Sequence, residues 1–428
     1  MPVQLARRFG GIVLLALAAA TPAHAAAERD LAALIDPLLD VPALVGAQAG
    51  VCIVRLRDGA ELYTRDADVS LIPASNVKLV TTAAALTYLG PDYRFRTEVY
   101  GELGADGVVT GDLTLKGYGD PYLIPERVWY LATRLYYLGV KDVRGDLVVD
   151  DSYFEGPMNA ESDEQGTASY AYLAPAGALS VAFNALLVHV LPAATVGQDA
   201  RVLIEPTSAY PLVRGSVRTS ARGRSAVEVD VEPHGDRSIV QVGGRIARGD
   251  GGRSYWRRVD NPAIFAGEVT RTMLERAGVR VRGRLRRGSV TQGASRLLSM
   301  SSPSLRELVD RINKHSNNFM AAQLARALGA ERFGAPGSWA KGQTAIADFL
   351  EHEVGVPHGT YAIDNASGLH DVNRASPRLV ARVLEHMYRH TELRPEYMAS
   401  LAVAGGSGTL HDRMRDSEAE HHLRAKTG

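Results

Sequence analysis

Ser75 and Lys78 stand three residues apart at the start of an apolar run from Leu79 to Leu89. On a helix this spacing puts both side chains on one face, about one turn apart and within reach of each other. A serine hydroxyl is a weak nucleophile until a base removes its proton, and a buried lysine with a lowered pKa can act as that base. The pair therefore indicates nucleophilic catalysis, although a serine helix cap followed by a solvated lysine is the alternative for the pair alone.

Two later motifs support the catalytic interpretation. Residues 316–318 read Ser-Asn-Asn, and residues 426–428 read Lys-Thr-Gly. The order Ser-x-x-Lys, Ser-x-Asn, Lys-Thr-Gly is similar to the motif set of penicillin-binding proteins and class A β-lactamases. In that set the second motif supplies a hydroxyl that relays a proton, and the third adds positive charge. A second Ser-x-x-Lys pair, Ser338 and Lys341, has no Ser-x-Asn after it, so Ser338 is predicted to cap a helix.

The elements that must position these motifs lie in two regions at either end of the chain. Two strands around an Asp-Gly turn precede the buried helix of the first motif. Helical periodicity returns after about residue 297, where Ser304 and Glu307 form a capping-box pattern. The predicted elements are strands at 49–55 and 60–63, and helices at 79–89, from Ser304 onward, and at 319–328, 338–352 and 376–390.

The region between them is predicted to be mostly β, as one or two subdomains. Short alternating runs are separated by Gly, Asp and Pro, which is typical of strands and turns. A catalytic domain of residues 26–92 and 297–428 is therefore predicted to be split by an insertion at 93–296. Alternating arginines at 280–286 are predicted to be a solvated strand face, since no aromatic residues interleave. The predicted strands are 96–103, 108–116, 147–149, 186–191, 201–205, 226–231, 238–246 and 279–285, with helices at 125–138 and 262–277.

Composition and the N-terminus limit where the protein works. Residues 1–25 combine Arg7, Arg8, an apolar run and a small-residue cleavage pattern, which predicts a secretory signal peptide. We therefore expect a periplasmic protein without a transmembrane anchor. The remaining chain has 46 basic and 48 acidic residues, a balance that gives no general attraction to nucleic acid. Cys52 is the sole cysteine of the sequence, so no internal disulfide forms, and it is predicted to be a packed small hydrophobe.

Longer stretches point to one family. Residues 117–121 (Gly-Tyr-Gly-Asp-Pro), 364–369 (Asp-Asn-Ala-Ser-Gly-Leu) with Asn373, and 405–410 resemble the phrasing of the D-alanyl-D-alanine carboxypeptidase/endopeptidase family, the class C low-molecular-mass penicillin-binding proteins. That family has a large insertion between its first two motifs, and here the two motif serines lie 241 positions apart. The resemblance implies an α/β (α+β) fold, with a penicillin-binding-protein/β-lactamase-like transpeptidase domain split by the β-rich insertion.

The resemblance also implies a role for each motif residue. Ser75 attacks the carbonyl of the penultimate D-Ala and forms an acyl-enzyme, while Lys78 takes its proton. Ser316, with Lys426 beside it, passes a proton toward the leaving D-Ala. No metal or organic cofactor is implied, the substrates are peptidoglycan stem peptides and their cross-links, and β-lactams are expected inhibitors. The remaining implied contacts are Asn318 for the peptide backbone, Thr427 for the terminal carboxylate and Gly428 for close approach.

Three features lie outside the core of the family pattern. Asp150 and Phe154 resemble an insertion stretch that reaches the amine of the substrate, with a solvated turn and a core aromatic as the alternatives. His370 and Asp371 stand where the family often has Ser-Arg, so the preference for the substrate side chain is left open. The family's strand continues past its Lys-Thr-Gly and supplies an oxyanion donor. We therefore expect the sequence ending at Gly428 to be part of a longer protein and to react slowly by itself.

Other functions are open to the same residues. A serine β-lactamase would need a deacylating glutamate, for which Glu155 is a loose match. A metallopeptidase would use His386 and His390, but Glu385 precedes the first histidine, where that class carries its glutamate just after it. A non-catalytic wall-binding module of the same fold is the alternative from a different class, and the intact motif residues argue against it.

Overall fold

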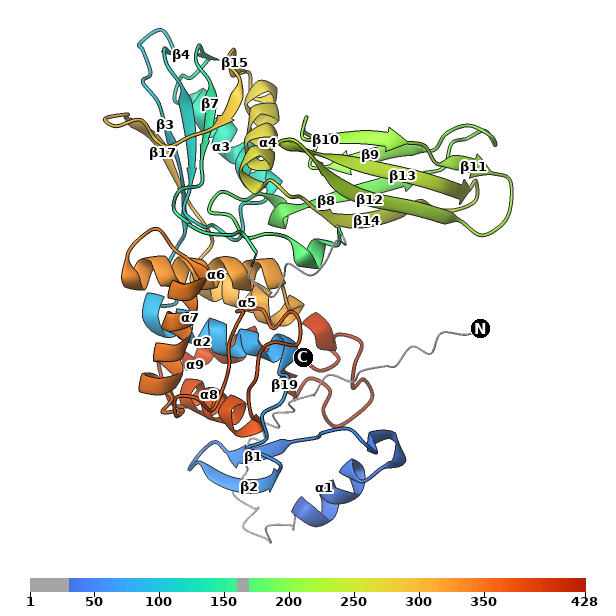
Figure 1. Cartoon of the computed structure of the whole chain (residues 1–428), viewed down its shortest axis with the longest axis vertical. Coiled ribbons are helices and arrows are strands. Elements are labelled where there is room, and N and C mark those ends of the chain that lie inside the picture. Colours follow the sequence, from blue (N-terminus) through green and yellow to red (C-terminus); the bar gives the residue numbers. More distant parts are fainter. Residues whose placement is uncertain (1–30, 160–168) are drawn as a thin grey trace. The chain divides into compact units, whose positions relative to one another are not determined.

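The computed structural model describes residues 31–159 and 169–428, so the predicted signal peptide lies outside the described residues. The described chain divides into two compact units (Figure 1). Unit 1 comprises residues 31–93, 304–332 and 339–428, and unit 2 comprises 94–303 and 333–338. Among the described helices, none combines the length and the apolar character that crossing a membrane requires.

Unit 1 is organised around one buried helix, α2 (Val77–Leu89). Every residue from Val77 to Leu86 is buried, so the helix has hardly any solvated face, which matches its Ala, Leu and Thr content. The other elements are α1 (Leu31–Leu39), β1 (Val51–Arg55), β2 (Ala60–Arg65), α5 (Leu305–His315), α6 (Asn318–Phe333), α7 (Trp339–Asp348), α8 (Pro377–Arg389), α9 (Arg394–Ser400), β18 (Ala402–Val403) and β19 (Arg424–Ala425). Helices α5, α7 and α8 pack on α2, and α8 also covers β1 (Figure 1).

Helix α5 begins and ends at local signals that place the second motif. The predicted capping box is present: Ser304 donates to the carboxylate of Glu307 from its backbone nitrogen at 2.8 Å and its hydroxyl at 2.6 Å. At the other end Ser316 adopts a left-handed conformation with φ of 55°, which stops the helix. Helix α6 then starts at Asn318. The Ser-Asn-Asn motif is therefore the turn between two helices.

One part of unit 2 is a sheet covered by two helices. Its elements are β3 (Arg96–Tyr100), β4 (Val108–Val109), β5 (Leu113–Gly117), α3 (Pro125–Tyr137), β6 (Asp142–Val143), β7 (Leu147–Asp150), α4 (Pro262–Arg276), β15 (Arg280–Val281), β16 (Leu285–Arg287) and β17 (Arg296–Ser301). The five-stranded sheet has the order β16-β7-β5-β3-β17, and a smaller sheet has the order β15-β6-β4. Helices α3 and α4 pack on each other, and α4 also packs on β7 and β16 (Figure 1).

The other part of unit 2 consists of two smaller sheets. Its strands are β8 (Ala185–Leu191), β9 (Arg201–Glu205), β10 (Pro211–Gly215), β11 (Arg218–Ser220), β12 (Ala226–His234), β13 (Arg237–Ala247) and β14 (Arg253–Arg258). One sheet has the order β14-β8-β9, and in the other β10, β11 and β12 all pair with β13. Along β8, Leu186, Val188 and Val190 are buried in a core shared with β12 and β13, whereas the residues between them are half-buried. The predicted α/β (α+β) class is confirmed.

The boundary between the units differs from the predicted one because of long-range strand pairing. Residue 297 was the predicted start of the second catalytic segment, but β17 pairs with β3 and holds the chain in unit 2 as far as Pro303. The short segment 333–338 also belongs to unit 2, where Gly337 forms a β-bridge with Phe154. Neither pairing has a local sequence signal.

The alternating arginines lie on β15, β16 and the loop between them, and their side chains meet aspartates. Arg282 pairs with Asp142, and Arg287 pairs with Asp151 at 2.9 Å. Arg286 is bound by two aspartates, at 112 and 146. These ion pairs neutralise much of the positive charge along this edge, in keeping with the interpretation as a solvated strand face rather than a nucleic-acid stripe.

Candidate active site

The first motif is formed where a short 3-10 turn, residues 74–76, leads into α2. Ser75 lies in this turn, and Ala74 before it has a φ of 47°, a backbone conformation that is strained for a residue other than glycine. Lys78 lies one turn further along and is completely buried. Its Nζ is 2.9 Å from the Ser75 Oγ, so the predicted nucleophile and base are within hydrogen-bond distance.

The other contacts of Lys78 match an uncharged amine. Its Nζ donates to the Asn318 Oδ1 at 2.7 Å and to the Ser367 carbonyl oxygen at 2.5 Å. A neutral amine has two N–H donors and one lone pair, so these two acceptors leave the lone pair for the Ser75 hydroxyl. Burial, and then the charge of Lys426, hold the pKa of Lys78 well below its usual value. This lowered pKa and the contact with Ser75 fit the predicted role of Lys78 as a proton acceptor.

The Lys-Thr-Gly motif brings a second lysine, Lys426, next to Ser316 of the Ser-Asn-Asn motif. Strand β19 pairs with β18 and ends at Ala425, so Lys426 follows the strand directly. The Lys426 Nζ donates to the Ser316 Oγ at 2.8 Å. Burial lowers the pKa of Lys426 to about 8, so the amine is mostly charged at neutral pH. Thr427 donates to the Thr409 Oγ1 at 3.0 Å, and Gly428 is exposed.

A loop at 364–373 completes this arrangement, although its residue types predict no role in the site. The Asn365 Oδ1 accepts from the backbone nitrogens of Ser367 at 3.2 Å and Gly368 at 2.7 Å. Asn373 in turn accepts from the Asn365 nitrogen at 3.1 Å. These bonds fix the loop so that the Ser367 carbonyl faces Lys78. The family-like stretch at 364–369 could have indicated that this loop belongs to the site. The contact itself uses a backbone carbonyl, which every residue type has, so residue types could not predict it.

Gly368 touches the nucleophile's turn. Its φ is 75°, and a Cβ there would lie 1.8 Å from the Ala74 carbonyl oxygen and 3.0 Å from the Ser75 nitrogen. Both neighbours are backbone atoms, so relief of the clash requires the turn to move. We expect Gly368→Ala to lower the rate of acylation by penicillin by about 10²-fold, because small misplacements of reacting groups cost that much.

Gly355 offers a matched control for this substitution. Its φ is 77°, but a Cβ there would meet nothing within 4 Å. Gly355→Ala therefore carries the same conformational cost, on the order of 1–2 kcal/mol, without the clash. Acylation rates and thermal unfolding of both variants would be measured together. Equal acylation rates for both variants would show that the close approach at Ala74 does not matter.

The two lysines predict a pH profile with two limbs. The acylation rate at low penicillin concentration should rise with pH as Lys78 loses its proton, at a pKa well below that of an ordinary lysine. It should fall above about pH 8, where Lys426 loses the charge held near Ser316. In Lys426→Arg the charge persists, so the falling limb should move to higher pH. A falling limb at the same pH in this variant would mean that another group causes it.

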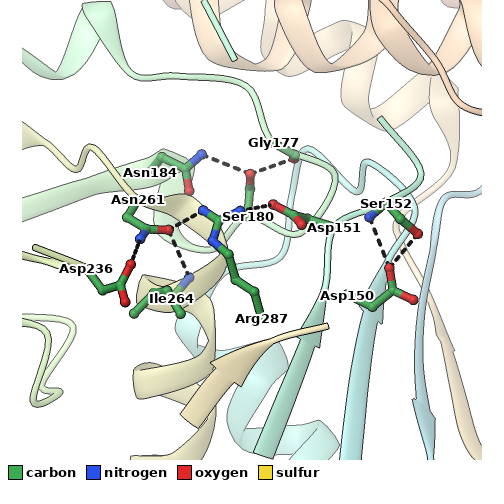
Figure 2. A network of polar contacts seen from close by, with 10 residues as sticks. All are labelled: Asp150, Asp151, Ser152, Gly177, Ser180, Asn184, Asp236, Asn261, Ile264 and Arg287. Carbon is green, nitrogen blue, oxygen red and sulfur yellow. Dashed lines mark hydrogen bonds and ion pairs between the residues drawn. The ribbon is translucent and has the colours of Figure 1, made fainter. Parts of the chain in front are cut away.

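Asp150 and Phe154 belong to unit 2, and their contacts are structural. The Asp150 carboxylate is fully buried; it accepts from Ser152 at 3.0 and 2.6 Å and from the Val290 nitrogen at 2.9 Å, and it pairs with Lys116 at 3.2 Å. Figure 2 shows it turned toward Ser152. Phe154 is only 8% exposed. These contacts favour packing roles, and the predicted contact with a substrate amine stays a prediction.

The neighbouring carboxylate has different partners. Asp151 is partly exposed and pairs with Arg287, whose guanidinium also donates to the Asn261 Oδ1 at 2.5 Å (Figure 2). Asn261 caps the first turn of α4 and donates to Asp236 at 3.2 Å. This chain of contacts ties the loop after β7 to helix α4.

The residues of the other functional alternatives lie as follows. His386 on α8 and His390, which caps its C-terminal end, are half-buried, with ring centroids 6.4 Å apart. Between residues 31 and 159 and from 169 onward, no group of three or more His, Cys, Asp or Glu side chains is placed to hold a metal ion. Glu155 is exposed and donates its backbone nitrogen to the Gly337 carbonyl in unit 2. Ser338 directly precedes α7, and its capping role stays a prediction.

The fold and the paired Ser-Lys site define a serine hydrolase of the penicillin-recognising type. Residues 31–428 match the D-Ala-D-Ala carboxypeptidase 3 (S13) family, and the chain belongs to that family. It is 36% identical over 410 residues to a D-alanyl-D-alanine carboxypeptidase of Actinomadura sp. (strain R39), covering 92% of this chain and 75% of that protein. It is 23% identical over 372 residues to the D-alanyl-D-alanine carboxypeptidase DacB of Haemophilus influenzae, covering 86% and 76%.

Solved structures show the same fold. Penicillin-binding protein 4 (dacB) from Haemophilus influenzae matches with a TM-score of 0.78 at 23% identity, over 89% of this chain and 84% of that one. The same protein complexed with a β-lactam matches with a TM-score of 0.71. The family resemblance drawn from the three motifs is thus confirmed, and the protein is a serine-type D-Ala-D-Ala carboxypeptidase.

Proposed function

We propose that Ser75 is the acylated residue and that the other motif residues serve it. Lys78 takes the proton of the Ser75 hydroxyl as the oxygen attacks the carbonyl of the penultimate D-Ala. The C–N bond to the terminal D-Ala breaks, and Ser316, beside the charged Lys426, relays the proton held by Lys78 to the leaving amine, so that Lys78 is neutral again. Water then hydrolyses the ester, which restores Ser75. The observation that carries this assignment is the contact of Lys78 Nζ with Ser75 Oγ at 2.9 Å in a buried setting.

The remaining motif residues hold the substrate in this proposal. Asn318 shares its Oδ1 with Lys78, so its amide nitrogen is the group that would bind a substrate carbonyl. Thr427 and Gly428, at the end of the Lys-Thr-Gly motif, would meet the terminal carboxylate. The positive charge of Lys426 would draw that carboxylate toward them.

The substrates we propose are peptidoglycan stem peptides, including their D-Ala cross-links. The relatives named D-alanyl-D-alanine carboxypeptidase support the first part. Cleavage of cross-links needs the same acyl-enzyme, with a longer amine as the leaving group. The signal-like residues 1–25 support export to the periplasm, where these substrates lie.

The test is the release of D-Ala. The protein is incubated with a peptide that ends in D-Ala-D-Ala and, separately, with a purified cross-linked muropeptide dimer. We expect free D-Ala from the first and monomers from the second, both blocked by penicillin. Penicillin-sensitive release of D-Ala with an intact dimer would restrict the enzyme to carboxypeptidase activity. No D-Ala release and no penicillin adduct would contradict the proposal.

A further inference from the structure

A strained turn in unit 2 holds an aromatic side chain at the edge of a groove. Ala182, Phe183 and Asn184 have φ values of 50°, 56° and 51°, a left-handed run that residues other than glycine rarely adopt. Buried Asn184 holds this turn, because its Nδ2 donates to the Pro175 carbonyl at 2.7 Å. The same Nδ2 donates to the Ser180 Oγ at 2.9 Å (Figure 2). Backbone strain of this kind persists where the surroundings fix it, often at binding sites.

The sheet β14-β8-β9 supplies the floor of this groove. Trp256, Leu187 and Glu205 are direct cross-strand partners, so they form one row across three strands. They lie on the face opposite the buried core residues of β8, because neighbouring residues of a strand point to opposite faces. The Trp256 side chain is 53% exposed. An open sheet face therefore presents a large ring beside an aliphatic side chain and a carboxylate.

Together these elements line an open groove with a volume of about 440 Å³. We call it the Trp256 groove; the residues that line it include Phe183, Leu187, Pro206, Trp256 and Met273, and also two acidic residues, Glu126 and Glu205. This volume is in the range of small-ligand sites. The groove lies wholly within unit 2 and contains none of the motif residues.

The charged residues that line the groove indicate which kind of ligand it can bind. Of the described residues that line it, none is Lys, Arg or His, so an anionic ligand would meet two carboxylates without a cation. Glu205 has His189 as a neighbour at 3.6 Å, and His189 contacts the Ser254 Oγ at 2.9 Å on the next row of the same face. The face thus offers hydrogen-bond acceptors beside an aromatic platform, which suits a neutral molecule with hydroxyl donors and one apolar face.

A pyranose sugar has this chemistry. One face of the ring carries mainly C–H groups, and the edge carries hydroxyls. We propose that the Trp256 groove binds a neutral saccharide, with a sugar ring stacked on Trp256 and its hydroxyls donating to Glu205 and Glu126. The case for a saccharide site rests on the exposed Trp256 row, the strained turn at 182–184 and the acidic lining of the groove, and it does not depend on the proposed function. The choice of an N-acetylated glycan as the probe rests on the proposed function, since peptidoglycan strands carry such sugars.

The test compares two equally exposed tryptophans. Trp129 on α3 is also 53% exposed and lies outside the groove. Binding of chitotetraose to the full chain and to Trp256→Ala and Trp129→Ala is measured by titration calorimetry. We expect wild-type binding with a Kd between about 10 µM and 1 mM, at least a tenfold loss in Trp256→Ala, and no change in Trp129→Ala. Trp256→Phe keeps a ring and should recover part of the affinity.

Several results would overturn the proposal. These are no wild-type binding at millimolar sugar, an equal loss in both tryptophan variants, or binding of an acidic or a cationic peptide in the groove with no binding of the sugar. Penicillin acylation is measured on the same samples and should be unchanged in Trp256→Ala. Normal acylation without sugar binding would reject the saccharide site and leave the catalytic proposal intact. Sugar binding without acylation would reject the catalytic proposal and leave the saccharide site intact.

Discussion

Ser75→Ala is expected to abolish covalent labelling by a fluorescent penicillin and to lower D-Ala release by at least about 10³-fold, since loss of a nucleophile removes the covalent route. The substitution removes one oxygen atom at the start of a buried helix, so the fold should persist. Gel fluorescence after brief exposure to the labelled penicillin, followed by D-Ala release, would measure both effects. Thermal unfolding of the variant would show that the loss is chemical.

The second Ser-x-x-Lys pair provides the control for this prediction. Ser338 lies in the segment 333–338 of unit 2, outside the unit that holds the three motifs. Ser338→Ala should therefore label as fast as the wild type. A band that survived in Ser75→Ala and vanished in Ser338→Ala would mean that the wrong serine has been assigned.

Lys78→Met is expected to slow acylation by about 10²–10⁴-fold, the usual contribution of a positioned general base. Methionine fills nearly the same volume in this fully buried site but cannot accept the proton of Ser75. It also leaves the Asn318 Oδ1 and the Ser367 carbonyl without the lysine donor. Stopped-flow acylation across pH would reveal the loss, and the rising limb of the pH profile should disappear with it.

Lys341→Met is the matched control, because Lys341 completes the other Ser-x-x-Lys pair. Its acylation rate and pH profile should equal those of the wild type. A rising limb that persisted unchanged in Lys78→Met, at a similar rate, would show that another group deprotonates the serine.

Local signals in the sequence were sufficient for several elements. The capping box of Ser304 and Glu307 supplies hydrogen-bond partners for backbone N–H groups in the first turn of α5. Because these two residues are only three apart, no distant contact is needed to start that helix. Helix α2 was predictable because a helix buried on all sides needs a mostly apolar composition, which the run from Leu79 to Leu89 has apart from its threonines and Tyr88. The elements missed are helices α1 and α9 and strands β6, β10, β11, β14, β17, β18 and β19. Their short runs hold few periods of any pattern, so packing partners rather than propensity decide their conformation.

The sequence by itself determined which residues can carry the chemistry, because motif order and residue type are properties of the chain. Only the tertiary structure decided how deeply each of these residues is buried, which groups it contacts and how its pKa is shifted. Lys78 is placed as the proposed base by partners 240 and 289 positions away that accept its N–H groups, and burial lowers its pKa. Asp150, which its residue type also made a candidate for the site, is instead enclosed by donors from Ser152, Val290 and Lys116. Burial and electrostatic interaction depend on distance in space, which separation along the chain does not encode.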